Sequence, residues 1–369
     1  MRSQTVGALL VGGCLALVVF VAVHADEEHA LGPYRFLTTI SIPGNLAGGF
    51  DISWADAETG RYYLADRGTT SIDVINTRRN TFLSAIHLHA AGNGVVAIHP
   101  SRDDDEDKDD HGGELWVGDA NSFVEVIDLK TQTIVADIST LGKARADELA
   151  YDPRDQMILI ANDRDPIPFV SFISTKTRTV IGTLSYPQVV FGTPAVGHGL
   201  EQSVWNARTR RFYLAVPATV THQHGEIDEI NPLTRMVTRV FPTTCNPAGL
   251  VLVPKQRLVT SCGDILSVAT GAVLRTVAGL GGDEIWFNQG DDRVYFGGGL
   301  DRISVPVLDT ETNRLVTTLT VGLLLPPPPA NSHTTHSVAA DSENNRIFVP
   351  VTHEGVKVYT DAKREDDDD

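Results

Sequence analysis

The chain has 369 residues and a formal net charge of -17, from 47 acidic and 30 basic side chains. Phosphate binding needs a basic surface, so this charge argues against nucleic acid as a partner. The 32 glycines and 19 prolines suit a β protein rich in turns, and a single large all-β ring of this length need not split into several domains.

The N-terminal residues 1–25 are predicted to be a signal peptide. Arg2 precedes an apolar run over 6–23, and Val23-His24-Ala25 forms a small-x-small cleavage site before Asp26. The alternative is an uncleaved anchor, because the apolar run is just long enough to span a bilayer. Cleavage would place the mature protein in the periplasm or outside the cell, without a membrane span.

The stretch 61–86 contains three short apolar runs separated by turn-forming residues. Val, Ile, Tyr and Thr at alternate positions, bounded by Gly, Asn and Asp, predict antiparallel strands joined by hairpins. The key segments are Tyr63-Leu64-Ala65-Asp66 and Asp73-Val74-Ile75-Asn76-Thr77. Related copies follow at 115–136, 158–174, 212–231, 258–268, 294–309 and 347–359.

These segments resemble the repeat of YVTN-type β-propellers over nearly the whole mature chain. The resemblance implies an all-β, seven-bladed propeller over residues 26–361, with four strands in each blade. The last copy lacks its outer strand, and residues 35–42, ahead of the first copy, can supply it and close the ring.

Several segments interrupt or follow the repeats. The acidic loop 102–110, within 99–113, could hold calcium, but a run of like charges is more often solvated. His222 and His224 could share a metal or lie in a solvated loop. The proline-rich segment 323–329 is expected to be a rigid linker, and residues 362–369 a disordered acidic tail.

Removal of the signal peptide leaves two cysteines, Cys245 and Cys262. They lie nearly opposite each other across a hairpin that turns at Pro254-Lys255. An even number of cysteines in an exported chain permits a disulfide, which we predict here. The alternative is two free buried thiols.

Polar residues cluster just ahead of the predicted innermost strands, which line the channel of a propeller. Two columns follow from the repeat alignment. The nearer column reads Asp51, Val95, Glu148, Gln202, Gly249, Glu284 and Ser337, and the farther reads Phe50, Gly94, Asp147, Glu201, Ala248, Asp283 and His336.

Successive strand residues face opposite ways, so only one column can point into the channel. The preferred inward set is Asp147, Glu201, Asp283 and His336, as ligands of a divalent cation: calcium, or manganese or zinc. Asp51, Glu148 and Glu284 would then support it, or form the opposite alternative. His198 and Asn246 are expected in loops near the same mouth. The polar residues could also simply cap backbone groups.

Three functions remain open from the sequence. The first is an exported, monomeric propeller that binds a small molecule or a protein partner at its ring face. The second is a metal-dependent hydrolase of lactones or esters, with Glu148 or Glu284 as general base. The third is a sugar lyase with His336 as base. A distant resemblance to gluconolactonase-type propellers implies a metal held by Glu, Asn and Asp, the residue types of Glu148, Glu201, Asn246 and Asp283.

Overall fold

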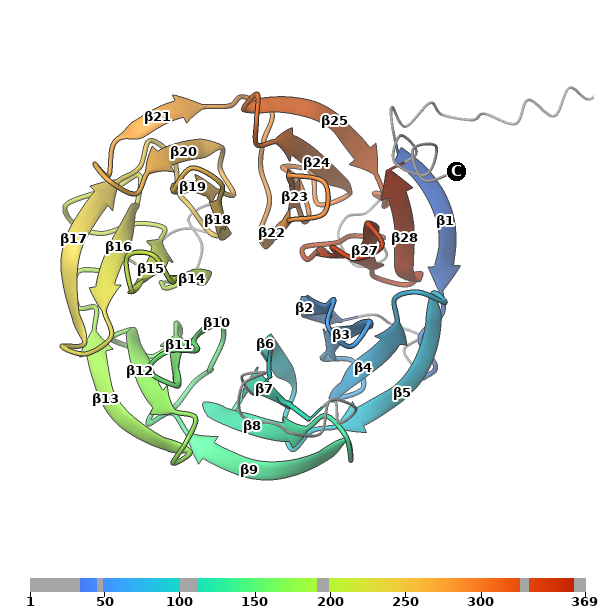
Figure 1. Ribbon diagram of the computed structural model, residues 1–369, viewed down its shortest axis with the longest axis horizontal. Coiled ribbons are helices and arrows are strands. Elements are labelled where there is room, and N and C mark those ends of the chain that lie inside the picture. Colours follow the sequence, from blue (N-terminus) through green and yellow to red (C-terminus); the bar gives the residue numbers. More distant parts are fainter. Residues whose placement is uncertain (1–33, 45–48, 100–111, 191–198, 326–331, 362–369) are drawn as a thin grey trace, which may run out of the picture. The chain divides into compact units, whose positions relative to one another are not determined.

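The computed structural model describes residues 34–44, 49–99, 112–190, 199–325 and 332–361, all within one compact unit, Leu31–Asp369. In these residues, 28 strands form seven four-stranded antiparallel sheets set around an axis (Figure 1). The protein is therefore a seven-bladed β-propeller, and the predicted fold class is confirmed. The expected signal peptide, the acidic loop 102–110 and the tail 362–369 lie outside the described residues. The described part contains no helix that could cross a membrane.

Each blade runs from an innermost strand at the axis to an outer strand at the circumference. Blades 1 to 3 are β2 (Phe50–Asp56), β3 (Arg61–Asp66), β4 (Ser71–Asn76) and β5 (Thr81–His87); β6 (Gly92–Ile98), β7 (Glu114–Asp119), β8 (Phe123–Asp128) and β9 (Thr133–Ser139); and β10 (Leu149–Asp152), β11 (Met157–Asn162), β12 (Phe169–Ser174) and β13 (Thr179–Ser185). Blades 4 to 7 are β14 (Ser203–Asn206), β15 (Arg211–Val216), β16 (Glu226–Asn231) and β17 (Met236–Pro242); β18 (Leu250–Val253), β19 (Arg257–Thr260), β20 (Asp264–Ser267) and β21 (Val273–Thr276); β22 (Ile285–Asn288), β23 (Arg293–Phe296), β24 (Ser304–Asp309) and β25 (Arg314–Thr320); and β26 (Ala339–Asp341), β27 (Arg346–Val351), β28 (Gly355–Asp361) and β1 (Tyr34–Ile40).

The turn from the third to the fourth strand explains the Asn, Asp or Ser that ends the repeat motifs. Asn76 and Asp128 accept hydrogen bonds from the backbone N–H groups three residues later, at 2.8 and 2.7 Å, and Asp309 does the same at 2.7 Å. One residue further on, Asn80 and Gln132 have φ angles of 52° and 55°. This left-handed residue completes a type I turn with a bulge, so the motif residue serves as a turn cap.

The core lies between neighbouring blades, where apolar faces of adjacent sheets pack together. Tyr62 of blade 1 stacks on Phe348 of blade 7 with ring centroids 4.9 Å apart. Trp116 of β7 is fully buried against blade 3, in a cluster with Ile158 and Ile160. Each blade therefore needs both neighbours to bury its faces, and the ring must close.

The N-terminal strand β1 closes the ring by pairing with β28, from Tyr34 opposite Asp361 to Ile40 opposite Val356. This confirms the predicted origin of the last outer strand. The Tyr34 hydroxyl also lies 3.2 Å from the Tyr295 hydroxyl of blade 6. The pairing joins the two ends of the described chain and covers the free edge of β28.

Candidate functional site

The innermost strands enclose a cavity of about 600 Å³ on the propeller axis. Glu148 and Glu284 immediately precede β10 and β22, whereas Pro153 and Gln289 immediately follow these strands, and all four line the cavity. Pro153 and Gln289 are exposed, but Glu148 and Glu284 are only 4% and 6% exposed. The cavity therefore opens at the Pro153 end and has two carboxyl groups at its buried end. Its volume is typical of a small-molecule site.

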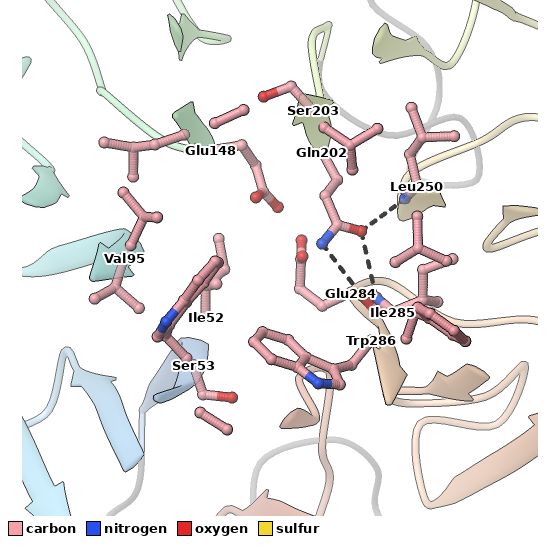
Figure 2. Close-up of a pocket in the computed structure, with 18 of the residues that line it drawn as sticks. Ile52, Ser53, Val95, Glu148, Gln202, Ser203, Leu250, Glu284, Ile285 and Trp286 are labelled. Carbon is pink, nitrogen blue, oxygen red and sulfur yellow. Dashed lines mark hydrogen bonds between the residues drawn. The ribbon is translucent and has the colours of Figure 1, made fainter. Parts of the chain in front are cut away.

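The two carboxyl groups come from blades 3 and 6 and point toward each other (Figure 2). Oε1 of Glu148 and Oε2 of Glu284 are buried and have no hydrogen-bond partner among the described residues. Two buried acceptors are thus available to a ligand that donates hydrogen bonds.

Burial raises the pKa of Glu148 to about 8, and Asp147 and Asp283 add to this effect. The pKa of Glu284 is raised well above its ordinary value, first by burial and then by the charge of Glu148. Both effects disfavour two carboxylates in this cavity, so the pair retains a proton at neutral pH.

The other polar side chains at this level are already engaged. The Gln202 side chain accepts from Leu250 N at 2.6 Å and donates to Ile285 O at 3.2 Å, which ties the inner strands of blades 4, 5 and 6 together (Figure 2). The hydroxyls of Ser53 and Ser337 are bonded to each other at 2.9 Å. One residue further along the inner strands, the buried Ser203 Oγ also lines the cavity without a hydrogen-bond partner, so the acceptors available to a ligand belong to Ser203 and the two glutamates.

Aromatic rings line much of the remaining wall. Trp54 and Trp286 meet edge to face, with ring centroids 5.1 Å apart, although they belong to blades 1 and 6. Blade 7 lies between them and contributes Ala340 to the wall, which leaves room for both indoles. Trp205 also lines the cavity, so three of the four tryptophans of the chain do so.

Charged side chains form a rim one residue before Glu148 and its equivalents in the other blades. Many of these charges are paired with each other. In blade 3, Arg145 forms an ion pair with Asp147 and donates from Nε to Asp163 at 3.0 Å. Burial opposes the charged form of Arg145, but Asp147 and Asp163 raise its pKa. Burial also raises the pKa of Asp163 to about 6. The rim carboxylates of this blade are thus neutralised from within the protein.

A second rim network joins blades 7, 1 and 2. His336 Nε2 lies 2.8 Å from Asp51 Oδ1, Asp51 forms an ion pair with Arg67, and Arg67 donates to Asn93 Oδ1 at 2.8 Å. About a third of the His336 side chain is exposed. Even so, desolvation at the crowded rim lowers the pKa of its imidazole, and Arg67 and Arg302 lower it further. The network ties three blades together at one end of the channel.

The strand register corrects the predicted columns in blade 1. Ser53 pairs with Leu64 in the way that Leu149 pairs with Ile160 in blade 3, so Ile52 takes the place of Glu148 in the cavity wall. Asp51 therefore aligns with Asp147 and not with Glu148. In blade 2 the equivalent pairing of Val95 with Val117 places Asn93 in the same column, a position that the sequence alignment missed.

The orientation of the columns also differs from the preferred prediction. The cavity is lined by Glu148 and Glu284, the opposite alternative, and its lining does not include Asp147, Glu201, Asp283 and His336. Arg67 and Arg145, which bind the rim carboxylates, were not among the predicted site residues. No local pattern marks these arginines, because each is defined by partners from other strands or loops.

The remaining predicted site residues have structural contacts or lie outside the description. Asn246 donates from Nδ2 to Pro217 O at 2.7 Å and to Gln223 O at 3.1 Å, within loops of the mouth. His222 is paired with Glu226. The predicted disulfide is present between Cys245 and Cys262, with Cα atoms 5.9 Å apart. His198 lies outside the described residues.

No protein-family model and no curated protein matches the chain. Propellers host many unrelated functions, so any function must be argued from the site itself.

The contacts of the rim's donor groups decide whether the rim could hold a metal ion. Asp147 and Asp51 are already paired with arginines, and His336 Nε2 is bonded to Asp51. Over the described parts of the chain, no three His, Cys, Asp or Glu side chains converge as metal ligands. The rim as arranged therefore does not fit a divalent cation unless arginines are displaced.

Proposed function

We propose that this chain is a binding protein that holds a small molecule in its axial cavity. One observation carries the proposal: the cavity ends in two buried carboxyl groups with oxygens that lack partners. A buried polar atom without a hydrogen bond costs about 1–3 kcal/mol. A ligand that donates to Glu148 and Glu284 would recover this cost, and the adjacent aromatic wall would bind its apolar part.

The proposal includes membership of the YVTN-type propellers and export from the cytoplasm. The repeat motifs and the closing N-terminal strand support the first point. Residues 1–25 and the Cys245–Cys262 disulfide support the second, because disulfides persist in oxidising compartments.

A metal-dependent lactone or ester hydrolase is the second candidate for the same channel. The raised pKa of Glu148, about 8, favours it, because a general acid or base works best with a pKa near the working pH. A cation at the rim would have to displace Arg145 from Asp147. The lyase hypothesis has less support, because the acidic channel repels uronate sugars and His336 is held by Asp51.

Ligand-observed NMR and tryptophan fluorescence with a mixed library of cationic, neutral and anionic fragments test the binding function. Three of the four tryptophans line the cavity and would report occupancy. Ala97→Phe projects a ring into the partly open wall of the cavity, and Ala269→Phe places the same ring on an exposed turn as a control. We expect binding to the parent protein and to the control, and loss in Ala97→Phe. Absence of binding by every fragment class would contradict the proposal.

Calcium, manganese and zinc are added separately in the same experiment, with the melting temperature and ester hydrolysis as readouts. A shift in melting temperature together with turnover, both lost in Asp147→Asn, would favour the hydrolase over the binding protein.

A further inference from the structure

The cavity combines acidic groups at its buried end with aromatic rings along its wall. We infer that its ligand is a primary ammonium compound with an apolar body, bound with the ammonium between Glu148 and Glu284 and the body against Trp54 and Trp286. This inference rests on the proposed binding function and specifies the chemical class of the ligand.

The charges around the buried end favour a cation. Glu148 interacts with Asp147, Asp283 and Arg145, and Glu284 interacts with Asp283 and Glu201. Among these groups only Arg145 is positive, and it is already paired with Asp147. Arg67 and Arg302 lie further out, near His336 on the rim, so the charged groups nearest the two glutamates are mostly acidic and favour a cation over an anion.

The hydrogen-bonding capacity selects an ammonium with N–H groups over a quaternary one. A bound cation displaces the proton that the pair otherwise retains, and the resulting carboxylates only accept hydrogen bonds, whereas a primary ammonium carries three donors and no acceptor. Two of these donors match Glu148 Oε1 and Glu284 Oε2, the buried oxygens without partners. A quaternary ammonium would leave both oxygens unsatisfied.

The aromatic and aliphatic wall of the cavity favours an apolar body for the part of the ligand beyond its ammonium group. Trp54, Trp286 and Phe287 line the cavity together with aliphatic side chains, including Val204 and Leu252. Indole rings attract nearby cations through their faces and bind apolar groups by burial. An aromatic or aliphatic body of a few carbons would satisfy this wall, whereas a fully polar polyamine would leave it unpaired.

Three probes of similar shape and different charge test the inference at pH 8: 2-phenylethylamine, 2-phenylethanol and 3-phenylpropanoate. Hydrogen bonds to a charged group contribute about 1.5–3 kcal/mol, so we expect the amine to bind at least about tenfold more tightly than the alcohol. The anion should not bind measurably. Dissociation constants come from tryptophan fluorescence titration and are checked by calorimetry.

The variants Glu148→Gln and Glu284→Gln keep the cavity volume and remove its charge. In the double variant the amine should bind within about threefold of the alcohol, while the alcohol keeps its affinity. Glu343→Gln, at an exposed turn position, is the matched control and should retain the full preference. The retained affinity for the alcohol shows that the double variant is folded with an intact cavity.

The outcomes separate the two proposals. Equal binding of amine and alcohol to the parent protein, or a preference that survives in the double variant, overturns the ligand class and leaves the binding function intact. Failure of all three probes, while neutral or anionic library fragments bind in the cavity, also overturns only the ligand class. Failure of the whole library overturns both.

Discussion

Asp147 and Glu148 are neighbours in the chain but belong to two different electrostatic regions. Asp147, on the rim, is paired with Arg145, whereas Glu148, in the cavity, faces another acid from the opposite side of the ring. The rim supplies its own countercharges and the cavity does not. The paired charges of the rim therefore stabilise the fold, whereas the carboxyl groups of the cavity remain available to a ligand.

The origin of the countercharges explains this difference. Arg67 and Arg145 lie in loops that reach the rim, just after β3 and shortly before β10. The cavity wall is made of inner strands, and none of its described lining residues is Lys or Arg. A charge at this depth can be balanced only by a proton or by a cation from outside.

The largest effect is expected from Arg145→Ala, which leaves the buried Asp147 without its ion-pair partner and Asp163 with only Arg164, at 3.7 Å. Removal of one partner of a buried ion pair costs about 3–5 kcal/mol, and we expect a loss of this size in the free energy of unfolding. Urea denaturation measures it. Arg178→Ala breaks a more exposed pair with Glu114 and should cost less than about 1 kcal/mol. Equal losses in the two variants would refute the structural role of the rim.

The disulfide is the counterpart of this ion pair in blade 5. In blade 5, Ala248 occupies the position of Asp147. The Cys245–Cys262 disulfide links the segment before the inner strand to a residue shortly after the second strand, just as the Arg145–Asp163 contact does in blade 3. The cysteines are separated by 17 positions in the sequence, and their replacement by alanine should cost about 3 kcal/mol. Reductant should destabilise the parent protein by a similar amount and leave the double variant unaffected; a parent protein insensitive to reductant would contradict the link.

In the cavity, Glu284→Gln should make the protein more stable at high pH. The unfolded chain releases the Glu148 proton near pH 4.5, but the folded protein keeps it up to about pH 8. This contribution is fully present below about pH 4.5 and is lost as the pH rises toward 8. Glu284→Gln removes a second carboxyl group, whose pKa is also raised well above its ordinary value by burial and by the charge of Glu148, so the variant should lose about 2 kcal/mol less between pH 5 and pH 8.5.

Urea denaturation at the two pH values measures this difference, with Glu343→Gln as the control. Identical pH dependence in the parent protein and in Glu284→Gln would show that the two carboxyl groups do not interact.

The smallest effect concerns the neutral pair at the same level. Ser53→Ala removes the partner of the Ser337 hydroxyl and should cost about 1 kcal/mol at every pH. This pH-independent loss would separate a simple hydrogen bond from the titrating glutamates. A loss that grows with pH would mean that the serines are coupled to the carboxyl pair.

The sequence alone determined the architecture. The alternating strands and the Asn or Asp turn caps predicted seven repeated hairpin units, and the surplus N-terminal strand predicted the closure that β1 and β28 make. The positions of Cys245 and Cys262 about one hairpin turn predicted their disulfide. These features depend on local propensity and short-range spacing, which a single sequence contains.

The tertiary structure alone decided which acids face the cavity. Strand alternation offers two orientations, and the pairing of Ser53 with Leu64 and of Val95 with Val117 on the next strands sets the register that aligns Asp51 and Asn93 with Asp147. Contacts such as His336 with Asp51 join residues 285 positions apart. Ring closure brings such groups together, and only their environment decides whether a carboxylate is neutralised on the rim or left for a ligand in the cavity.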